Sequence, residues 1–171
     1  MDDPRFSRSV VLVLKHDENG AMGVILNRPV DDSFDISDKL SGLFTEIRSA
    51  AVHGTSVCVG GPVAGPLIAL RRPSVRGGSG GVYLIEGSAE LRQLTKQVDG
   101  PLQFFVGHAG WAASQLEDEL ASGCWLTLPA SAEFLDSDHR EMWSMALRAS
   151  GRSIYRDILG IRGFPEDASL N

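Results

Sequence analysis

The sequence predicts an α+β fold, a single compact domain in which a mainly antiparallel or mixed sheet is flanked by helices. Short apolar runs of strand type recur along the chain, separated by turns rich in glycine, proline and asparagine. Between some of these runs, apolar residues recur at the three- and four-residue spacing of a helix. The chain shows no internal repeat and no linker, so we assign residues 1–171 to one domain, which is long enough to bury a substantial core.

The first predicted element is a β-hairpin. Residues 9–14 (SVVLVL) and 22–26 (MGVIL) are apolar runs of strand type. The turn between them contains Asn19-Gly20, the dipeptide best suited to a tight antiparallel hairpin. Pro29 ends the second run, because proline has no N–H to donate to a neighbouring strand.

The middle of the chain mixes one helix with short strands. Residues 35–51 carry apolar side chains on one helical face and predict a helix. Residues 55–59 predict a strand closed by Gly60-Gly61-Pro62, and residues 67–70 predict another. The glycine-rich stretch 76–81 predicts a mobile surface loop.

Two further helices are predicted from their capping residues. After a strand at residues 82–85, Ser88 is a suitable N-cap for a helix that stops at Gly100-Pro101. Asp138 and Glu141 form a capping pair for a later helix, which Gly151 is expected to end. Residues 154–171 are expected to pack loosely.

The stretch 104–130 (FFVGHAGWAASQLEDELASGCWLTLPA) predicts a strand, a turn, a helix and a second strand. Gly107 and Gly110 let the chain turn sharply against Trp111, which is expected at the entrance of the helix. Ala112, Leu116 and Leu120 form its apolar stripe. Because free N–H groups at a helix start can face a ligand, this turn is the best candidate site in the chain.

Composition limits the classes of partner. The formal net charge of -6 argues against a broad nucleic-acid surface and makes direct contact with DNA an unfavoured reading. No apolar run is long enough to span a bilayer, and no leader of signal-peptide type opens the chain. With only Cys58 and Cys124, the chain lacks the pattern of a disulfide scaffold, so we expect a reduced, cytoplasmic setting.

The candidate catalytic groups are few. His108 beside the turn is a candidate acid or base if Glu117 or Asp118 orients it. The other histidines do not have the spacing of metal ligands, and neither a metal nor a cofactor is predicted. Cys58 and Cys124 are flanked by apolar residues, and we expect both to be small buried core residues.

Three predicted strands end in polar or glycine-rich motifs, namely Asn27-Arg28-Pro29, Gly60-Gly61-Pro62 and the turn at Gly107. If these ends lie side by side, they line one shallow polar cleft. Arg28 is then the natural anchor for a small anion, because its planar guanidinium can bind a carboxylate or phosphate with two hydrogen bonds.

Three segments together resemble a known family. DPRFSRSVVLVLKHDENGAMGVILNRPV, VCVGGPV and VGHAGWAASQLEDELASGCWLTLPA, in this order and spacing, are similar to the YqgE/AlgH family of bacterial proteins. The resemblance implies a cytoplasmic α+β domain without an established enzymatic activity, and one branch of the family carries the label of transcriptional regulator. The positions that match the family pattern are Gly23, Asn27, Pro29, Gly60, Gly61, Pro62, Gly107, Ala109, Gly110, Trp111, Gln115, Leu116, Glu117, Trp125 and Pro129.

Two departures from the family pattern affect these expectations. Family members usually carry a further apolar strand before the Asp-Pro that stands here at residues 3–4, so the sheet is expected to have an unprotected edge or a gap that a partner fills. Such an edge is also a route to a homo-oligomer. His108 stands where tyrosine is more usual in the family, which weakens the argument for a catalytic histidine.

We therefore expect a non-enzymatic protein that binds a small anion or a protein partner and acts as a regulator. The alternative is a small hydrolase or transferase that uses His108, and a DNA-associated regulator is a weaker third reading. The candidate ligand-binding residues are Asn27, Arg28, Pro29, Gly60, Gly61, Pro62, Gly107, His108, Gly110, Trp111, Gln115 and Glu117.

Overall fold

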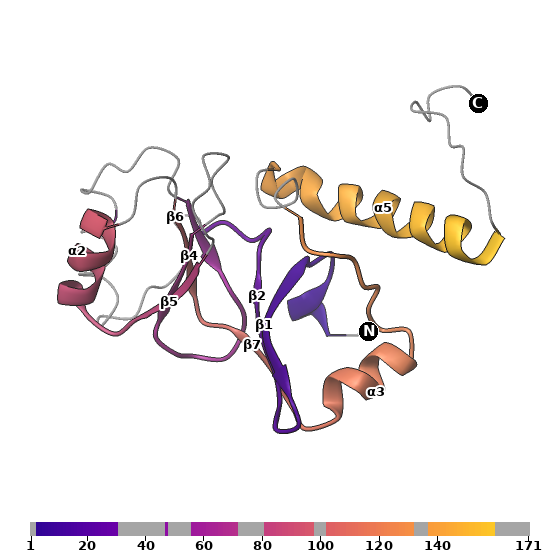
Figure 1. Cartoon of the computed structure of the whole chain (residues 1–171), viewed down its shortest axis with the longest axis horizontal. Helices are drawn as coiled ribbons and strands as arrows, with labels where there is room; N and C mark the ends of the chain where they lie inside the picture. Colours follow the sequence, from indigo (N-terminus) through magenta and orange to yellow (C-terminus); the bar gives the residue numbers. More distant parts are fainter. Residues whose placement is uncertain are drawn as a thin grey trace.

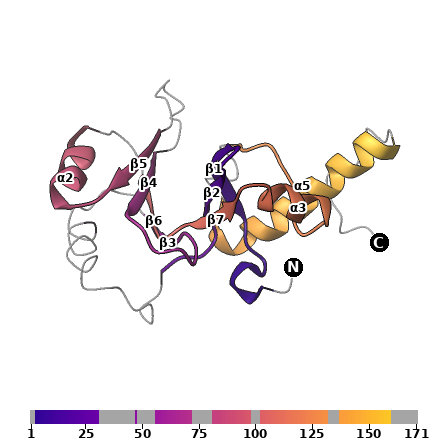
Figure 2. The same cartoon turned by 90° about the horizontal axis from the view of Figure 1, so that it is seen from below.

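The computed structural model describes residues 3–30, 47, 56–71, 81–97, 102–131 and 137–159. Within these ranges the strands form two sheets, which helices α2, α3 and α5 and the short 3-10 helix η1 (Pro4–Phe6) accompany (Figure 1, Figure 2). One strand pair is parallel and the others are antiparallel. The predicted α+β class with a mixed sheet is confirmed.

The first sheet has the order β1-β2-β7, with β1 (Val11–Asp17), β2 (Gly20–Ile25) and β7 (Ala109–Ala112). The predicted hairpin is present, since Val11 faces Ile25 and Asp17 faces Gly20. A β-bulge interrupts the register of β1 between Val13 and Lys15. The central strand β2 is bonded on both sides, whereas β1 lies at the edge of this sheet.

The second sheet has the order β3-β6-β4-β5. Its strands are β3 (Ser56–Val59), β4 (Leu67–Arg71), β5 (Gly81–Ile85) and β6 (Leu102–Val106). β3 and β6 pair in parallel, because the chain returns to the sheet in the same direction after β4, β5 and α2 (Ser88–Gln97). The strands predicted near these positions are therefore present.

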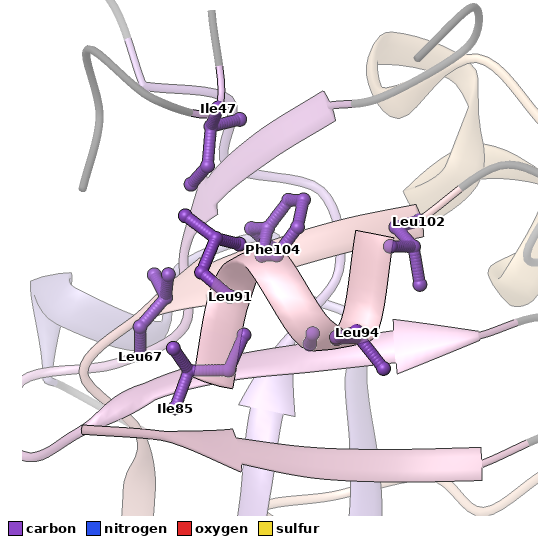
Figure 3. Close-up of a cluster of buried hydrophobic side chains, with 8 residues drawn as sticks. Ile47, Leu67, Ile85, Leu91, Leu94, Leu102 and Phe104 are labelled. Atoms are coloured by element: carbon purple, nitrogen blue, oxygen red, sulfur yellow. The ribbon is translucent and has the colours of Figure 1, made fainter. Parts of the chain in front are cut away.

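Helix α2 covers the outer face of the second sheet. Its buried Leu91 and Leu94 pack on Leu67, Ile85 and other apolar residues of the strands (Figure 3). At the start of the helix, the Glu90 carboxylate accepts hydrogen bonds from two backbone N–H groups, those of residues 86 and 87, each at 2.8 Å. The expected helix beginning near residue 88 is thus held by both packing and capping.

The two sheets pack face to face, and each face has its own apolar cluster. Between the sheets, buried residues of β2 and β4 meet Phe105 of β6 and Met142 of α5 (His139–Leu159). On the outer face of the first sheet, Ala109 and Trp111 pack against Leu116 of α3 (Gln115–Ala121). Figure 1 shows α2 at one end of the molecule and α3 and α5 at the other.

Two glycines allow the chain to cross from one sheet to the other. β6 leads into β7 through Gly107, whose φ is +69°, and the chain after β3 passes directly over this turn at Gly61, whose φ is +155°. A Cβ on Gly61 would lie 2.2 Å from the carbonyl carbon of His108. Two hydrogen bonds between Val63 and His108, at 2.9 and 3.0 Å, fix the crossing.

The prediction that a strand is followed by a turn and then directly by a helix is wrong between Gly107 and Gln115. Ala109–Ala112 form a strand on β2, so Trp111 lies in β7 and the helix starts later, at Gln115. Gly110 is exposed and does not have a positive φ, so the sharp turn belongs to Gly107 alone. The main-chain bonds that β2 offers outweigh the weak helix preference of this glycine- and alanine-containing segment.

Two other expectations also differ from the structure. Residues 124–131 follow an irregular path where a second strand was predicted, because no strand lies beside them among the described residues. Helix α5 runs through Gly151 to Leu159, since one glycine inside a helix costs only about 1 kcal/mol. The helix predicted at 35–51 (Ile47 excepted), most of the loop at 76–81, and residues 160–171 lie outside the described residues.

Candidate functional site: an apolar groove beside strand β1

The first predicted motif holds the chain segment that leads into β1. The Asn27 side chain accepts a hydrogen bond from Val10 N at 2.9 Å and donates one to Arg8 O at 2.8 Å. The Arg28 guanidinium donates to Ser7 O at 3.3 Å. These side chains therefore hold the backbone of residues 7–10 in place.

The backbones of the three predicted motifs lie next to one another. Pro29 forms a bridge with Cys58 just before Gly60-Gly61-Pro62, and Gly61 lies on the Gly107 turn. Several of their main-chain groups already form hydrogen bonds within the protein. Ile25 N donates to Gly60 O at 2.8 Å, and Gly60 N donates to Val106 O at 2.8 Å. The prediction of a small anion at this place stays a prediction, and the observed contacts give these glycines a role in packing.

The predicted acidic helper of His108 has another partner. His108 is half-buried beside Gly65, whereas the Glu117 carboxylate lies 2.6 Å from His16 Nε2 on an exposed surface. A hydrogen bond from its own backbone N–H, followed by the bond to His16, lowers the pKa of Glu117. In the described part of the chain, Glu117 is therefore not placed to orient His108.

Glu119, which the sequence did not single out, joins two of the three tryptophans. Trp111 Nε1 and Trp125 Nε1 both donate to its Oε2, at 3.0 and 2.7 Å, and Gln115 donates to Oε1 at 2.9 Å. Burial alone would raise the pKa of Glu119, but the bonds from Trp125, Gln115 and Trp111 together hold it below its ordinary value. The carboxylate is thus kept charged at the base of an aromatic cluster.

Phe6 completes this aromatic cluster. Its ring centroid lies 5.6 Å from that of Trp125 and 6.5 Å from that of Trp111, and the two indoles are 6.0 Å apart in an edge-to-face arrangement. Such ring pairs add stability beyond the area they bury. The aromatic cluster ties η1, β7 and the segment after α3 together.

A groove of about 630 Å³ opens beside this cluster. Its walls are residues 6–13 with the apolar half of β1, the segment 124–131, and one stripe of α5. The stripe consists of Trp143, Ala146, Leu147 and Ser150 and follows the spacing of a helix face. Of the twelve residues predicted from sequence, only Trp111 lines this groove.

The groove gathers apolar side chains that a free surface seldom carries together. All three tryptophans of the chain line it. So do Val13, Leu126 and Leu147, which remain 43%, 58% and 46% exposed. Among the described residues, the only charged residue in its lining is Arg8, whose guanidinium carbon lies 5.5 Å from the centre of the Trp143 ring. This arrangement suits an apolar ligand better than an ionic one.

The two cysteines differ in their surroundings. Cys58 is fully buried, as predicted, and lies 3.8 Å from His139 Nε2, with Gln103 beside both. Burial raises the pKa of the Cys58 thiol to about 11, so it remains protonated and unsuited to nucleophilic attack. Cys124 is only half-buried and lines the groove, which corrects its predicted place in the core.

The described residues contain neither a metal-binding cluster nor a membrane-spanning helix. No group of three or more histidine, cysteine, aspartate or glutamate side chains has a metal-binding arrangement among them. No helix among them has the length and hydropathy needed to span a membrane.

Fold and groove together define an α+β domain of two packed sheets with an apolar cleft at one sheet edge. The sequence profile described as AlgH-like matches residues 1–155, and the chain belongs to this family. A UPF0301 protein of Streptomyces avermitilis is 35% identical over 182 aligned residues, covering 99% of this chain and 89% of that protein. A UPF0301 protein of Xylella fastidiosa is 37% identical, covering 91% of this chain and 86% of its own length.

A solved structure supports the same assignment. The solution structure of the AlgH protein from Pseudomonas aeruginosa aligns with a TM-score of 0.62 and 27% sequence identity. The alignment covers 96% of this chain and 90% of that one. The resemblance inferred from the three sequence motifs is therefore confirmed.

Proposed function

We propose that the protein is a non-enzymatic regulatory protein that acts by binding a partner, and that the apolar groove is its binding surface. The observation that carries the proposal is the convergence of three tryptophans and three exposed aliphatic side chains on one concave surface. Large exposed apolar patches on proteins commonly mark places of interaction.

The described contacts favour this proposal over an enzyme. A hydrolase or transferase needs a nucleophile and a base within hydrogen-bond reach of each other at an accessible position. Glu117 is bonded to His16, and the buried Cys58 keeps its proton. The apolar groove, in contrast, needs no reactive group to bind a ligand.

The partner is proposed to be a protein in the cytoplasm. The net charge of -6, and a groove in which Arg8 is the single charged residue among those the structure describes, give little attraction for DNA phosphates. Both cysteines are free thiols, which fits a reducing compartment.

Binding of anilinonaphthalene sulfonate, a dye that reports apolar surface, tests whether the groove is a binding surface. The variant Leu126→Glu places a charge in the groove, and Leu84→Glu is its matched control, because Leu84 on β5 has the same 58% exposure and does not line the groove. We expect Leu126→Glu to weaken dye binding about tenfold, a difference of about 1.4 kcal/mol, and Leu84→Glu to leave it unchanged. Equal affinities for the two variants would contradict the proposal.

A further inference from the structure

We infer that the groove binds an extended apolar polypeptide segment, which adds to the free edge of β1 as a further strand of the first sheet. This inference rests on the proposed function and specifies the chemistry of the partner. Four observations on the described residues support it: the free edge of β1, the unpaired wall opposite, the two apolar clusters that meet at this edge, and the position of the charges on β1.

The free edge of β1 lies in the groove. Val10 directs both backbone groups toward β2, since Leu26 N donates to Val10 O at 2.8 Å and Val10 N donates to the Asn27 side chain. Because backbone groups alternate in direction along a strand, the N–H and C=O of Val11 and Val13 point away from β2. Both residues line the groove, and β2 is the only described strand paired with β1.

The opposite wall is also an unpaired segment of chain. Residues 125–130 (WLTLPA) have the composition of a strand but are bonded to no strand among the described residues. The absence of a neighbour explains why the strand predicted there did not form. A polypeptide segment between this wall and β1 can supply main-chain partners on the β1 side, which neither a lipid chain nor a small apolar molecule can do.

The side chains of such a segment would meet apolar surroundings on both faces. Leu12 of β1 packs against the cluster between the sheets, and Val11 packs against the cluster that contains Trp111. A strand added beside β1 points its side chains alternately toward these same two clusters. The ligand that fits is therefore a continuous apolar run of about five residues, as in strands buried on both faces.

Charges protect only the other half of the β1 edge. Beyond the groove, Lys15 and Asp17 form an exposed ion pair at 2.7 Å, and His16 is bonded to Glu117. Charged residues on edge strands discourage pairing with other chains. The half that lacks such protection, Val11 to Val13, is the half inside the groove.

A synthetic peptide with the core Val-Leu-Ile-Val-Leu, flanked by lysine pairs for solubility, tests the inference on the full-length protein. Binding is followed by tryptophan fluorescence, because every tryptophan of the chain lines the groove. The control peptide has the same sequence with N-methyl groups on alternate core amides, which removes donors on one edge and keeps the side chains. We expect the parent peptide to bind at least about tenfold more tightly than the control.

Amide hydrogen exchange gives a second, position-specific result. The bound parent peptide should slow exchange at Val11 and Val13 about tenfold. It should leave Leu12 unchanged, because the Leu12 amide faces Val24 of β2 whether or not the peptide is present. Leu126→Glu should weaken peptide binding, whereas the control Leu84→Glu should not.

The outcomes separate the inference from the proposed function. If the dye depends on Leu126 but the two peptides bind equally or neither binds, the groove is an apolar site without strand pairing, and the inference fails while the function stands. If sedimentation shows a dimer that Leu126→Glu dissociates, a second copy occupies the edge and the inference is overturned. If the dye does not depend on Leu126, the proposed function itself fails.

Discussion

Replacement of Gly61 by alanine is expected to destabilise the protein strongly, because the glycine lies where the two sheets cross. The new Cβ would lie 2.2 Å from the carbonyl carbon of His108 and 2.4 Å from both His108 O and Ala109 N. These neighbours are backbone atoms, which cannot rotate away as a side chain can. The φ of +155° is also unfavourable for a residue with a side chain.

The magnitude follows from these two effects. A strained backbone conformation costs about 1–3 kcal/mol, and an overpacked position costs about 1–3 kcal/mol more. The expected loss of about 2–6 kcal/mol is a large part of the roughly 5–15 kcal/mol that stabilises an ordinary domain. For a protein of this size it corresponds to a fall of roughly 4–24 °C in Tm.

Urea unfolding, followed by circular dichroism, measures this change, and Gly110→Ala is the matched control. Gly110 belongs to the neighbouring motif, but its added Cβ would have no neighbour closer than 3.8 Å in the described part of the chain, and its φ is not positive. We expect Gly110→Ala to change the unfolding free energy by less than about 0.5 kcal/mol. If Gly61→Ala were as stable as Gly110→Ala, the explanation of these glycines by packing would be refuted.

Three other predictions concern the groove and its surroundings. Glu119→Gln should lower the free energy of unfolding at neutral pH. Because folding lowers the pKa of the Glu119 carboxyl, the extra stability of the wild type should be complete above the ordinary pKa of 4.5 and should disappear as the pH falls through the folded-state pKa. Urea unfolding of both proteins at several pH values measures this difference. A thiol reagent at pH 7.5 should label Cys124 rapidly and Cys58 only after unfolding, because Cys58 is fully buried; rapid labelling of both would contradict its position. Asn27→Ala should speed amide exchange at Val10 by at least about tenfold, because it removes the acceptor of that N–H, and an unchanged rate would show that Asn27 does not hold this segment.

Local signals predicted most of the second sheet and the first hairpin. Asn19-Gly20 marked the turn, and the apolar runs that became β3 to β6 each have the length and composition typical of a strand. Strand β7 was not predicted, because the residues Ala109–Ala112 have little preference for strand structure and form a strand by pairing with β2. The parallel pairing of β3 with β6 likewise depends on contacts between distant segments, which no local pattern encodes.

The candidate site was predicted less well, for a related reason. The three glycine- and proline-containing motifs drew attention because they end strands, and in the structure their backbones meet. The groove instead depends on residues that no sequence motif distinguishes from other apolar or acidic residues of the chain, such as Leu126, Trp143 and Glu119. The available signal was the strand-like run 125–130 without a partner strand, together with the expected unprotected edge.

The central position of β2 also has a consequence for synthesis of the chain on the ribosome. β2 pairs with β1, its neighbour in sequence, but its other partner, β7, begins about 85 residues after β2 ends, which takes roughly 4–17 seconds at 5–20 residues per second. During this interval the nascent hairpin carries two open edges and uncovered apolar faces. We therefore expect the newly made chain to need protection by chaperones until residue 112 has been translated and has left the ribosome.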